Sequence, residues 1–155
     1  MIERFLRTLP LFQDLPDDDL AHVLMVSRVK RHAEGAVIVP EGALGGGGQL
    51  HVIAQGKVRI SKLIPGFGEE ALVILQAGGF FGELEFLDGA PASAQAMAHT
   101  DCEILSVPHG EILALMESRP ELAARFLWTF ARALASRLRE SNQRMASLLA
   151  ISRAF

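Results

Sequence analysis

The middle of the chain, residues 28–108, is a series of short β-forming runs interrupted by glycine, and this pattern restricts the fold more than any other feature. Several short strands with frequent turns are typical of a β-sandwich or a β-roll. We expect strands at residues 29–32, 36–39, 51–54, 58–63, 71–75, 94–99 and 102–107. The tripeptide Gln55-Gly56-Lys57 separates two of them and predicts a β-hairpin at that point.

Helical patterns flank this central region. Residues 2–27 carry apolar side chains at helical spacing, with a Pro-Asp-Asp-Asp start at Pro16, which predicts two short helices. Residues 111–117 predict another helix, and from Glu121 onward the sequence contains neither Gly nor Pro, which permits a helix of about nine turns. The predicted fold is therefore α+β: an antiparallel, jelly-roll-like β-roll flanked by N-terminal helices and a long C-terminal helix.

The length of 155 residues, half of them hydrophobic, suits one well-packed domain better than two. We expect a single domain over residues 1–155. Its parts are N-terminal helices at 1–27, the β-roll at 28–108 and C-terminal helices at 109–155.

Apolar residues recur along the last helix at intervals of four and three, as in a coiled coil. This seam consists of Leu127, Ala131, Leu134, Leu138, Ser141, Met145 and Leu148. Four arginines lie off the seam: Arg132, Arg137, Arg139 and Arg144. Part of the seam must pack on the chain's own β-roll, and we expect the rest to form a homodimer with a second copy of the helix.

Residues 78–98, GGFFGELEFLDGAPASAQAMA, combine closely spaced glycines, one glutamate of buried character and a Pro-Ala-Ser-Ala turn. We call this segment the cassette. Gly82 can open a short helix whose free N–H groups attract an anion, and Glu83 can accept a hydrogen bond from a sugar hydroxyl. Between Lys62 and Arg119 there is no Lys or Arg but there are nine carboxylates, so a phosphate here would depend on backbone amides, on Ser93 and on groups from elsewhere.

The cassette resembles the phosphate-binding segment of the cyclic nucleotide-binding domain family, of the catabolite activator type. Phe81, Gly82, Glu83 and Leu84 match its Phe-Gly-Glu-Leu, and Ser93 and Ala94 match the end of its Arg-Ser/Thr-Ala. The resemblance implies that amides at Gly82 and Leu84 meet the cyclic phosphate, and that Glu83 holds the ribose 2′-hydroxyl. Ala92 stands where the family has its phosphate-pairing arginine, which implies weak or altered nucleotide binding.

The resemblance extends to other segments. Leu11, Phe12 and Leu15 match the family's entry segment, and the long helix corresponds to its hinge, dimer interface and lid. Ser141 and Asn142 match positions that bond the base. The implied ligand-binding residues are Phe81, Gly82, Glu83, Leu84, Ala92, Ser93, Ala94, Ser141 and Asn142.

Charge and composition restrict the partners. A formal charge of −3 gives no general attraction to DNA or to anionic membranes, so we expect neither as a partner. Cys102 is the single cysteine, and the N-terminal residues lack the uninterrupted apolar core of a secretion signal, which favours a reducing cytoplasm. The longest segment without charged residues, 42–56, is too short and glycine-rich to span a bilayer.

Two other patterns carry little chemistry. The five histidines are scattered without metal-ligand spacing, so we expect neither a metal nor a catalytic site. The glycine run 45–48 lacks the Lys-Ser/Thr that follows a phosphate-binding P-loop, and it favours a flexible turn.

Three functions remain open. The first is a stand-alone, non-enzymatic regulatory domain without a tightly bound cofactor, which binds a cyclic nucleotide weakly and signals to an unknown partner protein by movement of its last helix. The second is a ligand-free domain used for dimerisation or docking. The third, a small cupin-like β-roll enzyme, lacks a visible metal cluster or nucleophile.

Overall fold

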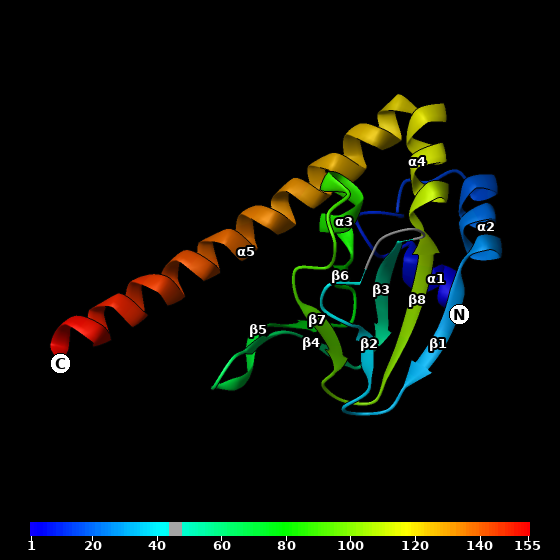
Figure 1. Ribbon diagram of the computed structural model, residues 1–155. Coiled ribbons are helices and arrows are strands. Elements are labelled where there is room, and N and C mark those ends of the chain that lie inside the picture. The colour runs from blue at the N-terminus through cyan, green and yellow to red at the C-terminus, as the bar shows by residue number, and fades with distance from the viewer. Residues whose placement is uncertain (44–47) are drawn as a thin grey trace.

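The computed structural model describes residues 1–43 and 48–155, and it shows two four-stranded antiparallel sheets with helices at both ends of the chain (Figure 1). One sheet has the order β1-β8-β3-β6 and the other β2-β7-β4-β5. The strands are β1 (Arg28–His32), β2 (Val37–Val39), β3 (Gln49–Gln55), β4 (Lys57–Ile64), β5 (Gly68–Gln76), β6 (Phe80–Phe81), β7 (Gln95–Ala98) and β8 (Cys102–Pro108). The predicted α+β fold is confirmed, and β6, of two residues, is the strand that the sequence did not predict.

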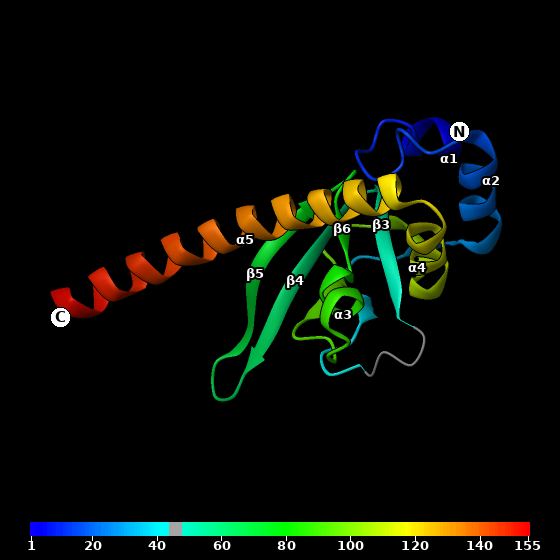
Figure 2. The same cartoon turned by 90° about the horizontal axis from the view of Figure 1, so that it is seen from above.

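The helices also follow the prediction. They are α1 (Ile2–Leu6), α2 (Asp17–Val26), α3 (Glu83–Asp88), α4 (His109–Ser118) and α5 (Pro120–Ala154). Pro120 suits the first turn of α5, where a backbone N–H has no helical partner. From there α5 continues for 35 residues, and its C-terminal half projects beyond the sheets in both Figure 1 and Figure 2.

The predicted hairpin at Gly56 is wrong. In the described part of the chain β3 pairs with β6 and β8, whereas β4 pairs with β5 and β7, so the turn passes from one sheet to the other. Gly56 has a φ of 82°, and a Cβ there would overlap the carbonyl oxygen of Asp101. The tight turn at Gly56 therefore connects strands of two different sheets. The local sequence of such a turn is the same as that of a hairpin, so the pattern could not distinguish the two.

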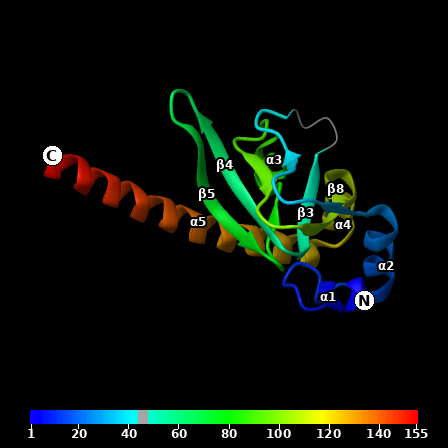
Figure 3. The ribbon, with the colours of Figure 1, turned by 90° about the horizontal axis from the view of Figure 1, so that it is seen from below.

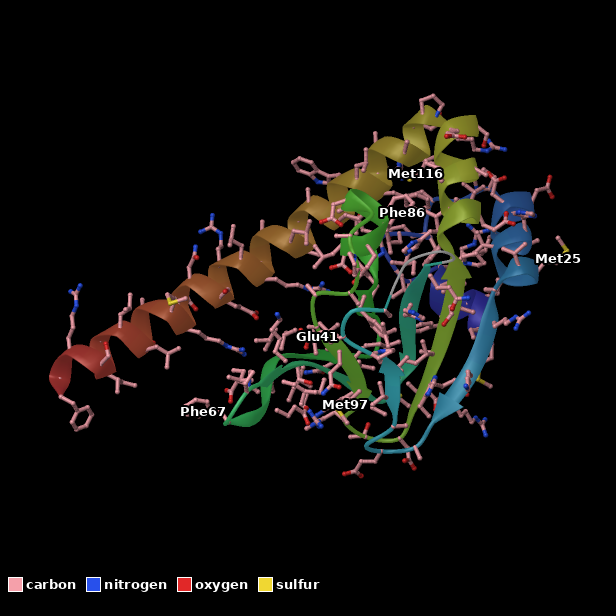
Figure 4. The ribbon with its side chains drawn as sticks, in the orientation of Figure 1. Met25, Glu41, Phe67, Phe86, Met97 and Met116 are labelled. Carbon is pink, nitrogen blue, oxygen red and sulfur yellow. The ribbon has the colours of Figure 1, made fainter. Side chains whose placement is uncertain are left out.

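The β4–β5 pair is a true hairpin, and Figure 3 shows it extending away from α1 and α2. Phe67 lies at its tip and points away from the rest of the chain (Figure 4). The hairpin and α5 lie on the same side of the molecule (Figure 2), and Arg144 of α5 donates hydrogen bonds to the backbone carbonyls of Ala71 and Leu72 in β5.

Two groups of buried apolar residues hold the fold together. The smaller one lies between the sheets and includes Ile53, Val58 and Ile104. The larger one joins the N-terminal helices, α4 and the first turns of α5 to the β1-β8-β3-β6 sheet, with Phe12 and Phe126 in edge-to-face contact at 6.4 Å. The beginning of α5 is therefore part of the core.

Over residues 1–43 and 48–155 no helix has a long enough apolar stretch to cross a bilayer. The glycine run discussed above falls mostly within residues 44–47, so its prediction lies outside the described residues.

Candidate functional site

A cavity of about 660 Å³ lies between the cassette, the β2-β7-β4-β5 sheet and α5. The strands supply mainly apolar side chains, such as Ile38 of β2, Ile60 of β4 and Val73 of β5. The cassette supplies the loops at one end, and α5 closes one side with Arg137, Ser141 and Arg144 among its lining residues. Its volume is within the usual range of small-molecule sites, roughly 300–1,000 Å³.

Gly82 allows the cassette to approach the neighbouring strand. Its φ of 92° is in the left-handed region, and a Cβ there would overlap the carbonyl oxygen of Gln49 in β3. The preceding residue, Phe81, pairs with His51 of β3, and the two rings stack at 4.8 Å. The chain is thus fixed before α3 begins, and glycine is required at its N-cap.

Glu83 is the most deeply buried charge of the cassette, with 1% of its surface exposed. Its carboxylate pairs with Arg137 of α5, 54 positions further along the chain. Arg137 also donates to the carbonyl oxygen of Phe80 at 2.7 Å and lies 5.8 Å from the centre of the Phe80 ring. Burial raises the pKa of the Glu83 carboxyl, and the guanidinium of Arg137 opposes that rise.

Residues 92–94, in the C-terminal part of the cassette, form no ion pair like that of Glu83 with Arg137. Ala92 is 5% exposed, and backbone hydrogen bonds join it to Gly42 and Ala43. Ser93 is exposed and Ala94 half-buried, and all three line the cavity. A serine hydroxyl is therefore the polar side chain that this tripeptide presents.

The structure gathers most of the predicted ligand-binding residues around this one cavity. Asn142 is exposed on α5 and is not part of the wall. The lining residues from the predicted set are Phe81, Gly82, Glu83, Leu84, Ala92, Ser93, Ala94 and Ser141. Their roles toward a ligand stay predictions.

The sequence prediction missed two residues, Arg137 and Arg144, which it treated only as arginines off the helix seam. Both line the cavity. They share a helix face with Ser141, at separations of four and three residues, and this spacing was the signal that could have placed them.

His51 lies beneath the cassette and is a structural group. Its Nδ1 is 2.7 Å from the hydroxyl of Ser106, and burial lowers the pKa of its imidazole to about 4. Burial also lowers the pKa of His109, another lining residue. Within the described residues no three side chains of His, Cys, Asp or Glu gather as metal ligands.

Comparison with known proteins adds an independent finding. The chain matches the family described as cyclic nucleotide-binding domain over residues 29–119. The cyclic AMP receptor protein of Thermus thermophilus is 34% identical over 133 residues, which are 86% of this chain and 59% of that protein. A CRP-like cAMP-activated global transcriptional regulator of Mycobacterium tuberculosis is 32% identical, over 66% of this chain and 44% of the relative. The chain thus spans about half the length of these relatives.

Solved structures of related regulators have a similar fold. The catabolite activator protein of Thermus thermophilus aligns with a TM-score of 0.69 and 33% identity, over 90% of this chain and 62% of that one. The N-terminal domain of a transcriptional regulator from Streptomyces coelicolor aligns with a TM-score of 0.65 and 32% identity, over 91% of this chain and 94% of that one. The sensor domain of the regulator DNR from Pseudomonas aeruginosa, at TM-score 0.77 and 21% identity over 90% of this chain and 92% of that one, shares the fold.

Proposed function

Because the chain belongs to the cyclic nucleotide-binding domain family, we propose that it is a sensor domain in which a ligand in the cavity changes the position of α5. Domains of this family are regulatory and not enzymatic, which agrees with the expectation that the chain is not an enzyme. The family assignment therefore argues against the cupin-like enzyme. The moving helix would be read by a partner protein.

The pair between Glu83 and Arg137 is the observation that carries this proposal. It joins the cassette, where a ligand hydroxyl would bind, directly to α5. A ligand that hydrogen-bonds to Glu83 competes with Arg137 or adds to it, and either result changes the contact that holds the helix. Ligand binding and helix position are then linked equilibria.

The proposed sensor binds cyclic AMP weakly, because Ala92 provides no cation for the phosphate. A charge-assisted hydrogen bond is worth about 1.5–3 kcal/mol, or roughly ten- to 150-fold in affinity. Ala92 faces the cavity, so an arginine at this position would enter it beside Ser93. Bidentate pairing of guanidinium with phosphate would then be available.

The test is calorimetric titration of cyclic AMP into the wild type and Ala92→Arg. We expect the substitution to raise affinity by at least about tenfold, and Glu83→Ala in the same background to remove most of that gain. Ala90→Arg is the matched control, because Ala90 is exposed in the same loop and does not line the cavity. A folded Ala92→Arg protein without gain would favour the ligand-free docking domain.

We also propose a homodimer formed through α5, in the cytoplasm. Leu138, Met145 and Leu148 are 61%, 57% and 63% exposed in the single chain, and a second helix would bury them. With its net charge of −3 the chain itself is not expected to bind duplex DNA.

A further inference from the structure

The cavity beside α5 carries more negative than positive side chains. Its described lining includes two arginines and four glutamates, namely Glu70, Glu83, Glu85 and Glu140. His51 and His109 stay neutral at about pH 7, because burial lowers both pKa values. Residues 44–47 are Leu-Gly-Gly-Gly and add no charge. The side chains of the lining therefore carry a net negative charge, of which Glu70 and Glu140 are exposed to solvent, so an anion that enters depends on backbone N–H groups for its attraction.

Both arginines are already engaged. Arg137 pairs with the buried carboxylate of Glu83 and with the carbonyl of Phe80, and Arg144 donates to the carbonyl of Leu72. A phosphate that took Arg137 would leave Glu83 buried without its counter-charge, which is strongly unfavourable. A phosphate that took Arg144 would release the contact between α5 and β5.

The wall itself is largely apolar. Ala92 occupies the position of the family's arginine, and it adds only a methyl group to the lining. Apolar side chains come from three strands and from α5: Ile38, Val39, Ile60, Val73, Met145 and Leu148. Such a wall binds a ligand by removing apolar surface from water, and a charged group placed against it would lose hydration without compensation.

Resting on the sensor function proposed above, we infer that the cavity's own ligand is an uncharged, largely apolar molecule with a hydroxyl that donates to Glu83. The carboxylate has more acceptor sites than Arg137 occupies, so it can hold the hydroxyl and keep its pair. The inferred ligand class therefore differs from a phosphate ester in charge, and it shares with a nucleoside a hydroxyl that can donate to Glu83.

The inference can be tested with two probes that share a shape but not a charge. Cyclic AMP and its methyl phosphotriester differ by one methyl group and one negative charge, and both diastereomers of the triester control for the position of the methyl group. On the wild type we expect the better triester to bind at least about tenfold more tightly than cyclic AMP. In Ala92→Arg this preference should disappear or reverse, whereas Ala90→Arg should keep it.

The outcomes separate this inference from the function on which it rests. If cyclic AMP binds the wild type as tightly as the triester or more so, the ligand class is wrong and the sensor function stands. If cyclic AMP is the only probe that binds, and it binds only to Ala92→Arg, the ligand class is again wrong and the sensor function again stands. If neither probe binds to the wild type or to the folded variant, the sensor function fails and the ligand class with it.

Discussion

The two halves of α5 have similar apolar spacing but different surroundings. In the first half Leu122, Phe126 and Phe130 are at most 5% exposed, and Phe130 contacts the ring of Phe80 at 5.5 Å between centroids. Beyond Arg137 no residue of this fully described helix is buried, although its apolar residues continue. One helix is thus an anchor in its first half and a largely exposed arm in its second (Figure 1).

Arg137 lies at the boundary between these halves, and its partner is the buried glutamate of the cassette. Similar apolar spacing along one helix therefore does not by itself place the residues in the core. The anchor requires no ligand, because core packing holds it. The arm depends on the contacts of Arg137 and Arg144, which are close to the cavity.

The largest effect is expected in the anchor. Phe126→Ala removes a ring that is 1% exposed and packs on Phe12, so it should lower the free energy of unfolding by about 3–5 kcal/mol. Trp128→Ala is the matched control, since Trp128 is 67% exposed on the same helix, and it should cost about 0.5 kcal/mol or less. Urea denaturation measures both, and equal losses would show that the anchor is not packed as described.

An intermediate effect is expected at the boundary. Arg137→Leu leaves Glu83 buried without its counter-charge and should cost about 1–3 kcal/mol, less than a fully buried pair because Arg137 is partly exposed. Arg139→Leu, at an exposed arginine two residues further along, is the control.

The decrease in unfolding free energy caused by Arg137→Leu should depend on pH. Burial raises the pKa of the Glu83 carboxyl in the folded state. The free energy of unfolding that depends on this carboxyl therefore falls as the pH rises above the pKa that the carboxyl has in the unfolded chain. Removal of Arg137 raises the pKa further, so the deficit should be larger at about pH 7.5 than at about pH 5. Adding Glu83→Gln should abolish this pH dependence, and a deficit that is the same at both pH values would contradict the account of the pair.

The smallest effect on the folded chain is expected in the arm. Leu138→Glu should change the unfolding free energy of the monomer by about 0.5 kcal/mol or less, because Leu138 is exposed. It should nevertheless convert the proposed homodimer to monomers, since a two-fold interface buries the charge twice. Light scattering measures this, with Ser136→Glu as a control outside the seam. A wild type that is monomeric at on the order of tens of micromolar would refute the dimer.

The sequence predicted the fold well because its main signals are local. Glycine-punctuated β runs and a long stretch without Gly or Pro determine the number and order of the elements. The error at Gly56 has a different origin. Which sheet a strand joins depends on pairing partners far away in the sequence, such as β8 for β3 and β7 for β4.

The candidate site could be predicted only in part, because local segments can be read from the sequence and contacts between distant segments cannot. The cassette is a continuous segment, so its lining residues could be read from the sequence. The cation that faces Glu83 could not, because the segment 63–118 contains no Lys or Arg and Arg137 comes from a helix 54 positions away. The exposed position of Asn142 likewise depends on how α5 is rotated against the β-roll.

The most direct test of the account is the distance between the β-roll and each half of α5 as a ligand binds. Spin labels at exposed positions, Lys30 paired with Ala124 in the anchor or with Ala150 in the arm, would be placed in a Cys102→Ala, Ala92→Arg background. An excess of unlabelled chain removes distances between subunits. On saturation with cyclic AMP we expect the Lys30–Ala150 distance to change and the Lys30–Ala124 distance to stay the same. If ligand binds and both distances stay the same, or both change together, the division of α5 into anchor and responsive arm is contradicted.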